Sequence, residues 1–425
     1  MQFGIPLFLG LGLALIPVNA AVVTVIRDVN VIDGTGAGPV PHSTIVIKDE
    51  RIVTLGPVAK VATPPGARVI EGAGRYVIPG LWDMHVHLWH SQNQLPVYVA
   101  NGVTGVRDMG SDFVRTNAWR EAVEAGKAIG PHVVTSGPAV AGKKPDDDKL
   151  PVIVAVDAEA ARRAFDQLDD MGVDFVKVLT DLPRQSYFAL AERARKWRGT
   201  VAGHIPAAVT AREAINARQA SVEHLFGLFV ACSSMEERVR AGQADAAMAV
   251  KTFDEEKARE LFKQSALFET RQTPTLTLWE RMSRTEAAAR VHDPRLRYVP
   301  QAIRATWPKA EEELKPLPDD EAAAMRAQVD VAYRMVRLMK ETGVEIMAGT
   351  DTGDPYTVPG VTLQRELELL VKAGLTPAQA LETATVIPAR FLGWEESMGT
   401  LKAGMVADLV VLDANPLADI RNVSK

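Results

Sequence analysis

The stretch Tyr76-Val77-Ile78-Pro79-Gly80-Leu81 leads through Trp82 into Asp83-Met84-His85-Val86-His87, so an apolar run ends in two histidines. In a β-strand, side chains two positions apart point to the same face. His85 and His87 would therefore present two imidazoles side by side where the strand ends. Paired neutral imidazoles are a common start of a zinc-type metal site. A chance pair on a half-exposed strand is the alternative for this stretch taken alone.

Strand-like and helical stretches alternate beyond this run. The further strands are expected at residues 105–108, 132–136, 174–179, 200–204, 221–224, 273–276 and 345–351. Helical stretches include residues 157–172, 185–197 and 320–342, and longer helical insertions span 233–271 and 281–318. Eight strand–helix units predict an α/β fold of the TIM-type (β/α)8 barrel class.

Both ends of the chain have a different pattern. Short β-branched runs separated by turn residues fill residues 22–70, and one more strand is expected within 404–413. A single C-terminal strand needs a sheet to join. We therefore predict a small composite β-sandwich domain from residues 21–78 plus 396–425, and a barrel domain over 79–395.

Metal-capable side chains recur where the predicted barrel strands end, which is where active sites of such barrels lie. The candidate ligands are His85, His87, Lys177, His204, His224 and Asp351. Four of the eight histidines of the chain fall at the ends of three strands. Scattered core histidines would rarely do so, and this favours a metal site.

Lys177 lies within the apolar strand Phe175-Val176-Lys177-Val178-Leu179. An inward ammonium would be buried at high cost and repelled by cations beside it. The alternative is an outward lysine that extends between helices. A lysine carboxylated by carbon dioxide would instead be an anion with two oxygens, able to bridge two metals.

These motifs together resemble the amidohydrolase superfamily. The matching segments are DMHVH, the lysine of DFVKVLT, the histidines of VAGHIP and VEHLFG, the aspartate of MAGTDTG, and the stretches 374–381 and 399–412. The pattern is similar to the imidazolonepropionase-like branch, which includes Xaa-Pro dipeptidases, related carboxypeptidases and ochratoxin-hydrolysing amidases. Lys177 separates the chain from true imidazolonepropionases, which use one metal.

The resemblance implies a binuclear site in which His85, His87 and Asp351 hold one divalent ion and His204 and His224 the other. Carboxylated Lys177 and a hydroxide would bridge the two ions. Paired ions lower the pKa of a bound water and polarise a carbonyl. Asp351 can then act as general base and acid. Nitrogen and oxygen ligands without sulfur suit Zn²⁺, and manganese, cobalt and iron stay open.

The expected reaction is hydrolysis of the amide bond of an N-acyl or peptidyl amino acid, with aromatic amides such as ochratoxin A among the substrates. An esterase or lactonase on the same site, or a catalytically silent binding relative, are the alternatives. Arg107 could bind a substrate carboxylate, or it could form a salt bridge that holds the barrel. Lys143 and Lys144 could supply the same charge, or they could be solvated loop residues. Trp89, Trp279 and Tyr356 could line an aromatic pocket.

Composition and the first residues give the remaining expectations. A net charge of −5 with no basic block argues against nucleic acid as a partner, and Cys232 as the single cysteine excludes an internal disulfide. Residues 1–20 are apolar and end in small residues, which predicts a signal peptide and a periplasmic or secreted protein. No later segment is expected to span a membrane. The resemblance implies a homo-oligomer, and an octamer is one assembly it suggests.

Overall fold

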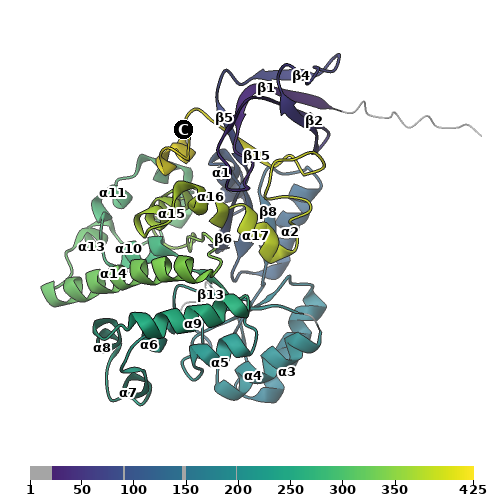
Figure 1. Ribbon diagram of the computed structural model, residues 1–425. Helices are drawn as coiled ribbons and strands as arrows, with labels where there is room; N and C mark the ends of the chain where they lie inside the picture. Colours follow the sequence, from purple (N-terminus) through teal and green to yellow (C-terminus); the bar gives the residue numbers. More distant parts are fainter. Residues whose placement is uncertain (1–21, 90, 146–149, 198) are drawn as a thin grey trace, which may run out of the picture.

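The computed structural model describes residues 22–89, 91–145, 150–197 and 199–425, and it has an α/β fold with parallel sheets (Figure 1). The predicted signal peptide lies outside the described residues. Among the described residues, no helix combines the length and apolar character that a membrane crossing requires.

A six-stranded sheet joins the two ends of the chain. Its strands are β1 (Val23–Val31), β2 (Val40–Lys48), β3 (Arg51–Pro57), β4 (Arg68–Glu71), β5 (Tyr76–Pro79) and β15 (Leu409–Leu412). The order is β15-β5-β1-β2-β3, with β4 also paired to β1. The C-terminal strand thus joins the N-terminal strands as predicted, and Figure 1 shows β15 beside β5. The second layer of a sandwich, and the domain boundaries, stay predictions.

The central parallel strands form two sheets. One has the order β6-β7-β8, from β6 (Leu81–Val86), β7 (Val103–Asp108) and β8 (His132–Thr135). The other has the order β10-β9-β11-β12-β13-β14. Its strands are β9 (Ala139–Ala141), β10 (Val152–Val154), β11 (Val176–Val178), β12 (Val201–Gly203), β13 (Ser221–Glu223) and β14 (Arg271–Thr273). The sequence does not predict β9 or β10.

Backbone hydrogen bonds outside the regular strand pairs link these two sheets. Asp174 N donates to Thr135 O at 3.0 Å between the β11 and β8 sides. On the other side, Gln272 N donates to Glu345 O at 3.1 Å, and Met84 N donates to Ala348 O at 2.8 Å. These bonds run in the order that an eight-stranded barrel requires, and its closure stays a prediction.

Two predicted strands need correction. Residues 345–351 form no regular strand: within them Ile346 makes an isolated bridge with Gln272, and the next bridge pairs Thr352 with Val86. The Asp83 carboxylate contributes to the irregularity, because it accepts from Thr350 N at 3.1 Å and from Thr350 Oγ1 at 2.6 Å, and Thr350 N also donates to His85 O. The strand predicted at 273–276 ends at Thr273 instead, and a helix begins at Leu276.

Helices surround the parallel strands (Figure 1). The α-helices are α1 (Leu95–Ala100), α2 (Phe113–Glu124), α3 (Ala158–Met171), α4 (Arg184–Lys196), α5 (Ala211–Asn216), α6 (Leu228–Ala231), α7 (Glu236–Arg240), α8 (Ala246–Lys251), α9 (Glu255–Leu267), α10 (Leu276–Met282), α11 (Ala287–Val291), α12 (Gln301–Arg304), α13 (Ala310–Leu314), α14 (Asp319–Thr342), α15 (Val361–Lys372), α16 (Pro377–Thr383) and α17 (Val386–Leu392). Short 3₁₀ turns are η1 (Gln92–Gln94), η2 (Pro294–Tyr298) and η3 (Ile420–Ser424). The helices α3, α4 and α14 confirm the three predicted stretches, and the insertions are helical as expected.

Candidate metal centre

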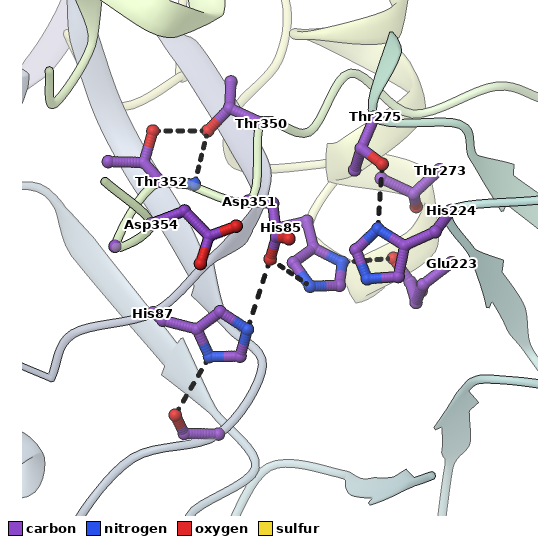
Figure 2. Close-up of polar contacts among 12 residues, drawn as sticks. His85, His87, Glu223, His224, Thr273, Thr275, Thr350, Asp351, Thr352 and Asp354 are labelled. Atoms are coloured by element: carbon purple, nitrogen blue, oxygen red, sulfur yellow. Dashed lines mark hydrogen bonds and ion pairs between the residues drawn. The ribbon is translucent and has the colours of Figure 1, made fainter. Parts of the chain in front are cut away.

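Asp351 lies between the two histidines that end β6 (Figure 2). Its Oδ1 is 3.3 Å from Nε2 of His85 and 3.3 Å from Nε2 of His87. His224, which directly follows β13, completes the group: one ligand atom of each of His85, His224 and Asp351 lies within 4.8 Å of the others. The structure therefore gathers side chains from the ends of β6 and β13 and from the irregular stretch that contains Asp351 around one point.

Each of the four predicted histidine ligands uses Nδ1 for a hydrogen-bond contact. The Nδ1 partners are Glu223 Oε2 for His85 at 2.8 Å, Gly110 O for His87 at 3.0 Å, Thr180 Oγ1 for His204 at 2.8 Å and Thr275 Oγ1 for His224 at 2.8 Å. Such partners fix the ring orientation of metal-binding histidines. The arrangement leaves Nε2 of each ring available as a ligand.

The donor set of His85 and His87 fits a metal ion. A carboxylate or a carbonyl oxygen can only accept, so Nδ1 of both rings must donate, and Nε2 of the neutral ring then carries a lone pair. Both lone pairs face the Asp351 carboxylate, and the buried His85 Nε2 makes no hydrogen bond. Lone pairs gathered around an anion repel unless a cation lies between them. These residues are therefore suited to hold a divalent ion.

The backbone around Asp351 allows this close approach. Asp351 has a φ of 60°, in the left-handed region that ordinary side chains avoid. Glycines flank it, and a Cβ on Gly349 would lie 2.8 Å from His85 Cβ, while one on Gly353 would lie 2.8 Å from His87 Cβ. The glycines of MAGTDTG thus leave room for the carboxylate to meet the imidazoles.

The second pair of histidines is held in the neutral form. The rings of His204 and His224 lie 5.3 Å apart between centroids, and those of His85 and His224 lie 4.3 Å apart. Burial holds the pKa of both His204 and His224 well below the ordinary value, and the charge of Lys177 lowers both further. Burial raises the pKa of Asp351, but the neighbouring imidazoles outweigh it and hold the pKa well below its usual range. The site therefore offers neutral imidazoles and an ionised carboxylate.

Lys177 lies in the middle of β11 and is 1% exposed. It lines a cavity of about 260 Å³ together with His87, His204, His224 and Asp351. Burial lowers the pKa of its ammonium to about 8. Its side chain therefore lies inward at the site, as in the interpretation of a buried lysine, and does not extend outward between helices.

Arg107 lies beneath the histidines in a buried polar network. Its Nη2 donates to Glu223 Oε1 at 2.9 Å, its Nη1 donates to Ser221 Oγ at 2.9 Å, and its Nε donates to Met84 O at 2.7 Å. Burial raises the pKa of Glu223, but Arg107 and His85 more than offset this and hold it far below its ordinary value. These contacts favour the salt-bridge interpretation of Arg107, because its donors orient the carboxylate that orients His85.

The other candidates for substrate contact separate into two groups. Lys143 and Lys144 are exposed, and neither is among the described residues that line this cavity. Trp89 lines it and stacks on His87 with ring centroids 4.2 Å apart. Trp279 is buried against Phe226 and Phe229 instead. An aromatic wall therefore exists, formed by Trp89 and Phe226 of the described residues.

Sequence reasoning missed the residues that orient the ligands, chiefly Glu223, Thr180 and Thr275. One signal was available for Glu223, because a glutamate directly before a candidate metal ligand at the end of a predicted barrel strand is a candidate for burial and pairing. Thr180 and Thr275 carry no such signal, since each is a common residue beyond a strand end.

A larger cavity of about 470 Å³ adjoins the site. Asp351 and Leu278 line both cavities, and Tyr356 lines the larger one. The Asp351 carboxyl therefore stands where the two spaces meet.

Known proteins are similar to this chain in sequence and in fold. Ochratoxinase from Aspergillus niger is 22% identical over 465 residues, which cover 95% of this chain and 84% of that protein. Imidazolonepropionase from Symbiobacterium thermophilum is 25% identical over 404 residues, covering 88% and 85%. A putative prolidase from Bifidobacterium longum has a similar solved structure, with a TM-score of 0.70, 25% identity, and coverage of 95% and 91%.

The model of the amidohydrolase family matches residues 76–425, which include every candidate ligand. The resemblance inferred from the sequence motifs is confirmed, and metal dependence is typical of the family. The chain belongs to the amidohydrolase family and is a hydrolase that acts on amide or peptide bonds.

Proposed function

We propose that this chain is a binuclear metalloenzyme that releases an amino acid from N-acyl or peptidyl substrates. His85, His87 and Asp351 would hold one ion, and His204 and His224 would hold the second. Lys177, carboxylated, would bridge them, and zinc suits the nitrogen and oxygen donors. An esterase or lactonase on the same site is the second candidate.

One observation carries the proposal: the lone pairs of His85 and His87 face the Asp351 carboxylate, and His85 Nε2 is buried without a hydrogen bond. A catalytically silent relative has no need to keep this arrangement, because it costs stability when no cation is bound. All six proposed ligand positions carry ligand-type side chains.

The chemistry needs two contributions. When bound, divalent ions lower the pKa of a coordinated water and polarise the substrate carbonyl. Asp351 then accepts a proton from the attacking water and passes it to the leaving amine as the C–N bond breaks. Its place between the two cavities suits this transfer, because the acyl half and the leaving half of a substrate must meet there.

The position of Lys177, and not its ammonium form, supports the proposal of a second ion. Its side chain is buried beside His204 and His224, and it makes no ion pair with any described residue. A cation there would oppose a second metal by charge repulsion. The carboxylated form would reverse that charge and supply two oxygens.

The aromatic wall of Trp89 and Phe226 suits an apolar or aromatic acyl group. Proteins named ochratoxinase and putative prolidase are similar to this chain. We extend the proposal to aromatic amides of amino acids, with ochratoxin A as one example. The proposal also includes four further features: closure of the parallel strands into a barrel, a flanking β-sandwich, export from the cytoplasm and a homo-oligomeric state.

Metal analysis and a substrate panel test the function together. Purified protein should contain about two divalent ions per chain and should hydrolyse N-acyl amino acids faster than the matching esters or lactones. Hydrolysis of esters alone would favour the second candidate. Full metal content without activity on either class would contradict the enzymatic proposal.

A further inference from the structure

The cavity of about 470 Å³ next to the metal centre carries an unusual pattern of charge. Three of its arginines are neutralised by carboxylates on the same wall. Arg281 pairs with Asp354, Arg295 pairs with Asp293 at 2.8 Å, and Arg365 pairs with Glu280 at 2.6 Å. The charge of each of these arginines is therefore balanced by a carboxylate, and Arg365 also pairs with Glu368 at 2.6 Å.

Arg290, on α11, differs from the other arginines of this wall. It forms no ion pair with any described residue, although it is half-buried. Its Nη1 donates to Thr285 O and its Nη2 to Arg281 O at 3.5 Å, so backbone carbonyls orient the guanidinium. Glu286, on the same wall, is exposed and lies outside ion-pair distance. A half-buried guanidinium held by neutral acceptors has fork donors left for an anion.

Asp351 connects this cavity to the reaction. It lines both cavities, and under the proposed function it gives its proton to the leaving amine. The leaving amine must then lie at the junction, with the rest of the leaving group in the cavity that Arg290 lines. The acyl half occupies the smaller cavity beside Trp89 and Lys177.

We propose that Arg290 binds a carboxylate on the leaving-amine half of the substrate, and so determines the preference for products that are free amino acids. This inference rests on the proposed function for its orientation of the substrate. Arg290 then takes the role of the carboxylate-binding cation that the sequence suggested for Arg107, Lys143 or Lys144. The donors of Arg107 are engaged beneath the site, and the two lysines are exposed.

The test compares N-acetyl-L-phenylalanine with its C-terminal amide, in wild type, Arg290→Ala and Arg290→Lys. Wild type should favour the free carboxylate, and Arg290→Ala should lower kcat/KM for that substrate about 10- to 10²-fold, mainly through KM. The carboxamide should be cut at a similar rate by both proteins, which serves as a control for folding. Arg290→Lys should recover part of the preference, because the charge remains without the fork.

Arg297→Ala is the matched control, since Arg297 lies in the same insertion, donates to Tyr298 and is not among the residues that line the cavity. It should leave the ratio of the two rates unchanged. An Arg290→Ala protein with the wild-type ratio would overturn the inference.

Equilibrium binding separates this inference from the proposed function. The same two compounds are titrated by calorimetry into metal-depleted wild type and Arg290→Ala. Tighter binding of the carboxylate that depends on Arg290 supports the inference even if no hydrolysis is found, in which case the proposed function alone fails. Equal binding by wild type and Arg290→Ala would contradict the inference whatever the activity.

Discussion

The imidazoles of His85 and His87 each use Nδ1 to donate a hydrogen bond, and this determines whether Nε2 of the same ring can bind a metal. Glu223 requires a proton on Nδ1 of His85, and the Gly110 carbonyl requires one on Nδ1 of His87. Nε2 of each neutral ring therefore carries a lone pair that is directed at Asp351. Glu223 is in turn held by Arg107. The orientation and tautomer of the two histidines are therefore set by neighbouring residues behind the site.

Asp351→Asn tests the role of the carboxylate in proton transfer. The amide cannot accept the proton, so kcat should fall at least ~10²-fold while the fold is kept. Some loss of metal is also expected, because the carboxylate lies against both His85 and His87. Rates should be measured at saturating Zn²⁺, beside metal analysis. A near-normal kcat at full occupancy would assign the proton transfer to another residue.

Lys177→Ala tests the bridge between the proposed ions. The variant should bind about one ion fewer per chain and lose most activity, because His204 and His224 alone leave the second ion with few protein ligands. Lys196→Ala, which removes an exposed lysine paired with Glu192, is the control and should match wild type. Unchanged metal content and full activity in Lys177→Ala would refute the bridging role.

At the scale of elements, local signals located the helices and the ligand-bearing strand ends. Helix α3 was predicted closely because Asp157 caps its first turn and Gly172 ends it with a φ of 81°. The strand predicted at 273–276 was wrong for a non-local reason. Glu366 accepts from Leu276 N at 2.9 Å and Thr277 N at 2.8 Å, and it fixes the start of α10 from a distant part of the chain.

The same limit applies to the site. The histidine ligands could be predicted because each lies at or just after the end of a strand, whereas Lys177 lies inside the strand β11 and Asp351 follows a stretch without a regular strand. Their partners could not, since the contact between His85 and Glu223 joins residues that are 138 positions apart. No local pattern encodes such a pairing.

Thr275→Val tests whether the turn between β14 and α10 positions His224. Thr275 has a φ of 45°, and its hydroxyl is 2.8 Å from His224 Nδ1, so the substitution removes the contact at nearly constant volume. Metal affinity, measured by competition with a chelator, should fall about 10- to 10²-fold. Thr270→Val removes a buried hydroxyl bond at the other end of β14 and should affect stability alone. Equal metal affinity in the two variants would count against the positioning role.

At the scale of the whole molecule, the C-terminal segment closes the fold from the end opposite to the metal centre. The strand β15 pairs with β5, and just before it Asp408 Oδ2 contacts His132 Nε2 at 3.0 Å, where β8 begins. His132 also stacks on Trp82 of β6. One histidine therefore joins the composite sheet to the parallel strands.

This contact should make stability depend on pH in a defined direction. The hydrogen bond to Asp408 raises the pKa of His132 above its usual value near 6.5, against the effect of burial. The folded state therefore binds the proton more tightly than the unfolded state. The stabilisation is complete below about pH 6.5, the unfolded value, and is lost as the pH rises through the higher folded value. Because His132 is 39% exposed, the effect should stay below about 1 kcal/mol.

Urea unfolding of wild type and His132→Gln at pH 5.5 and pH 8.5 measures this pH dependence of the free energy of unfolding. The free-energy difference between the two proteins should be larger at pH 5.5, when the imidazolium faces Asp408. In an Asp408→Asn background, the change of this difference with pH should shrink, because only the weaker attraction of Glu124 and Glu50 then favours the charged ring. A difference that is equal at both pH values in the wild-type background would show that His132 contributes through packing on Trp82 rather than through its charge.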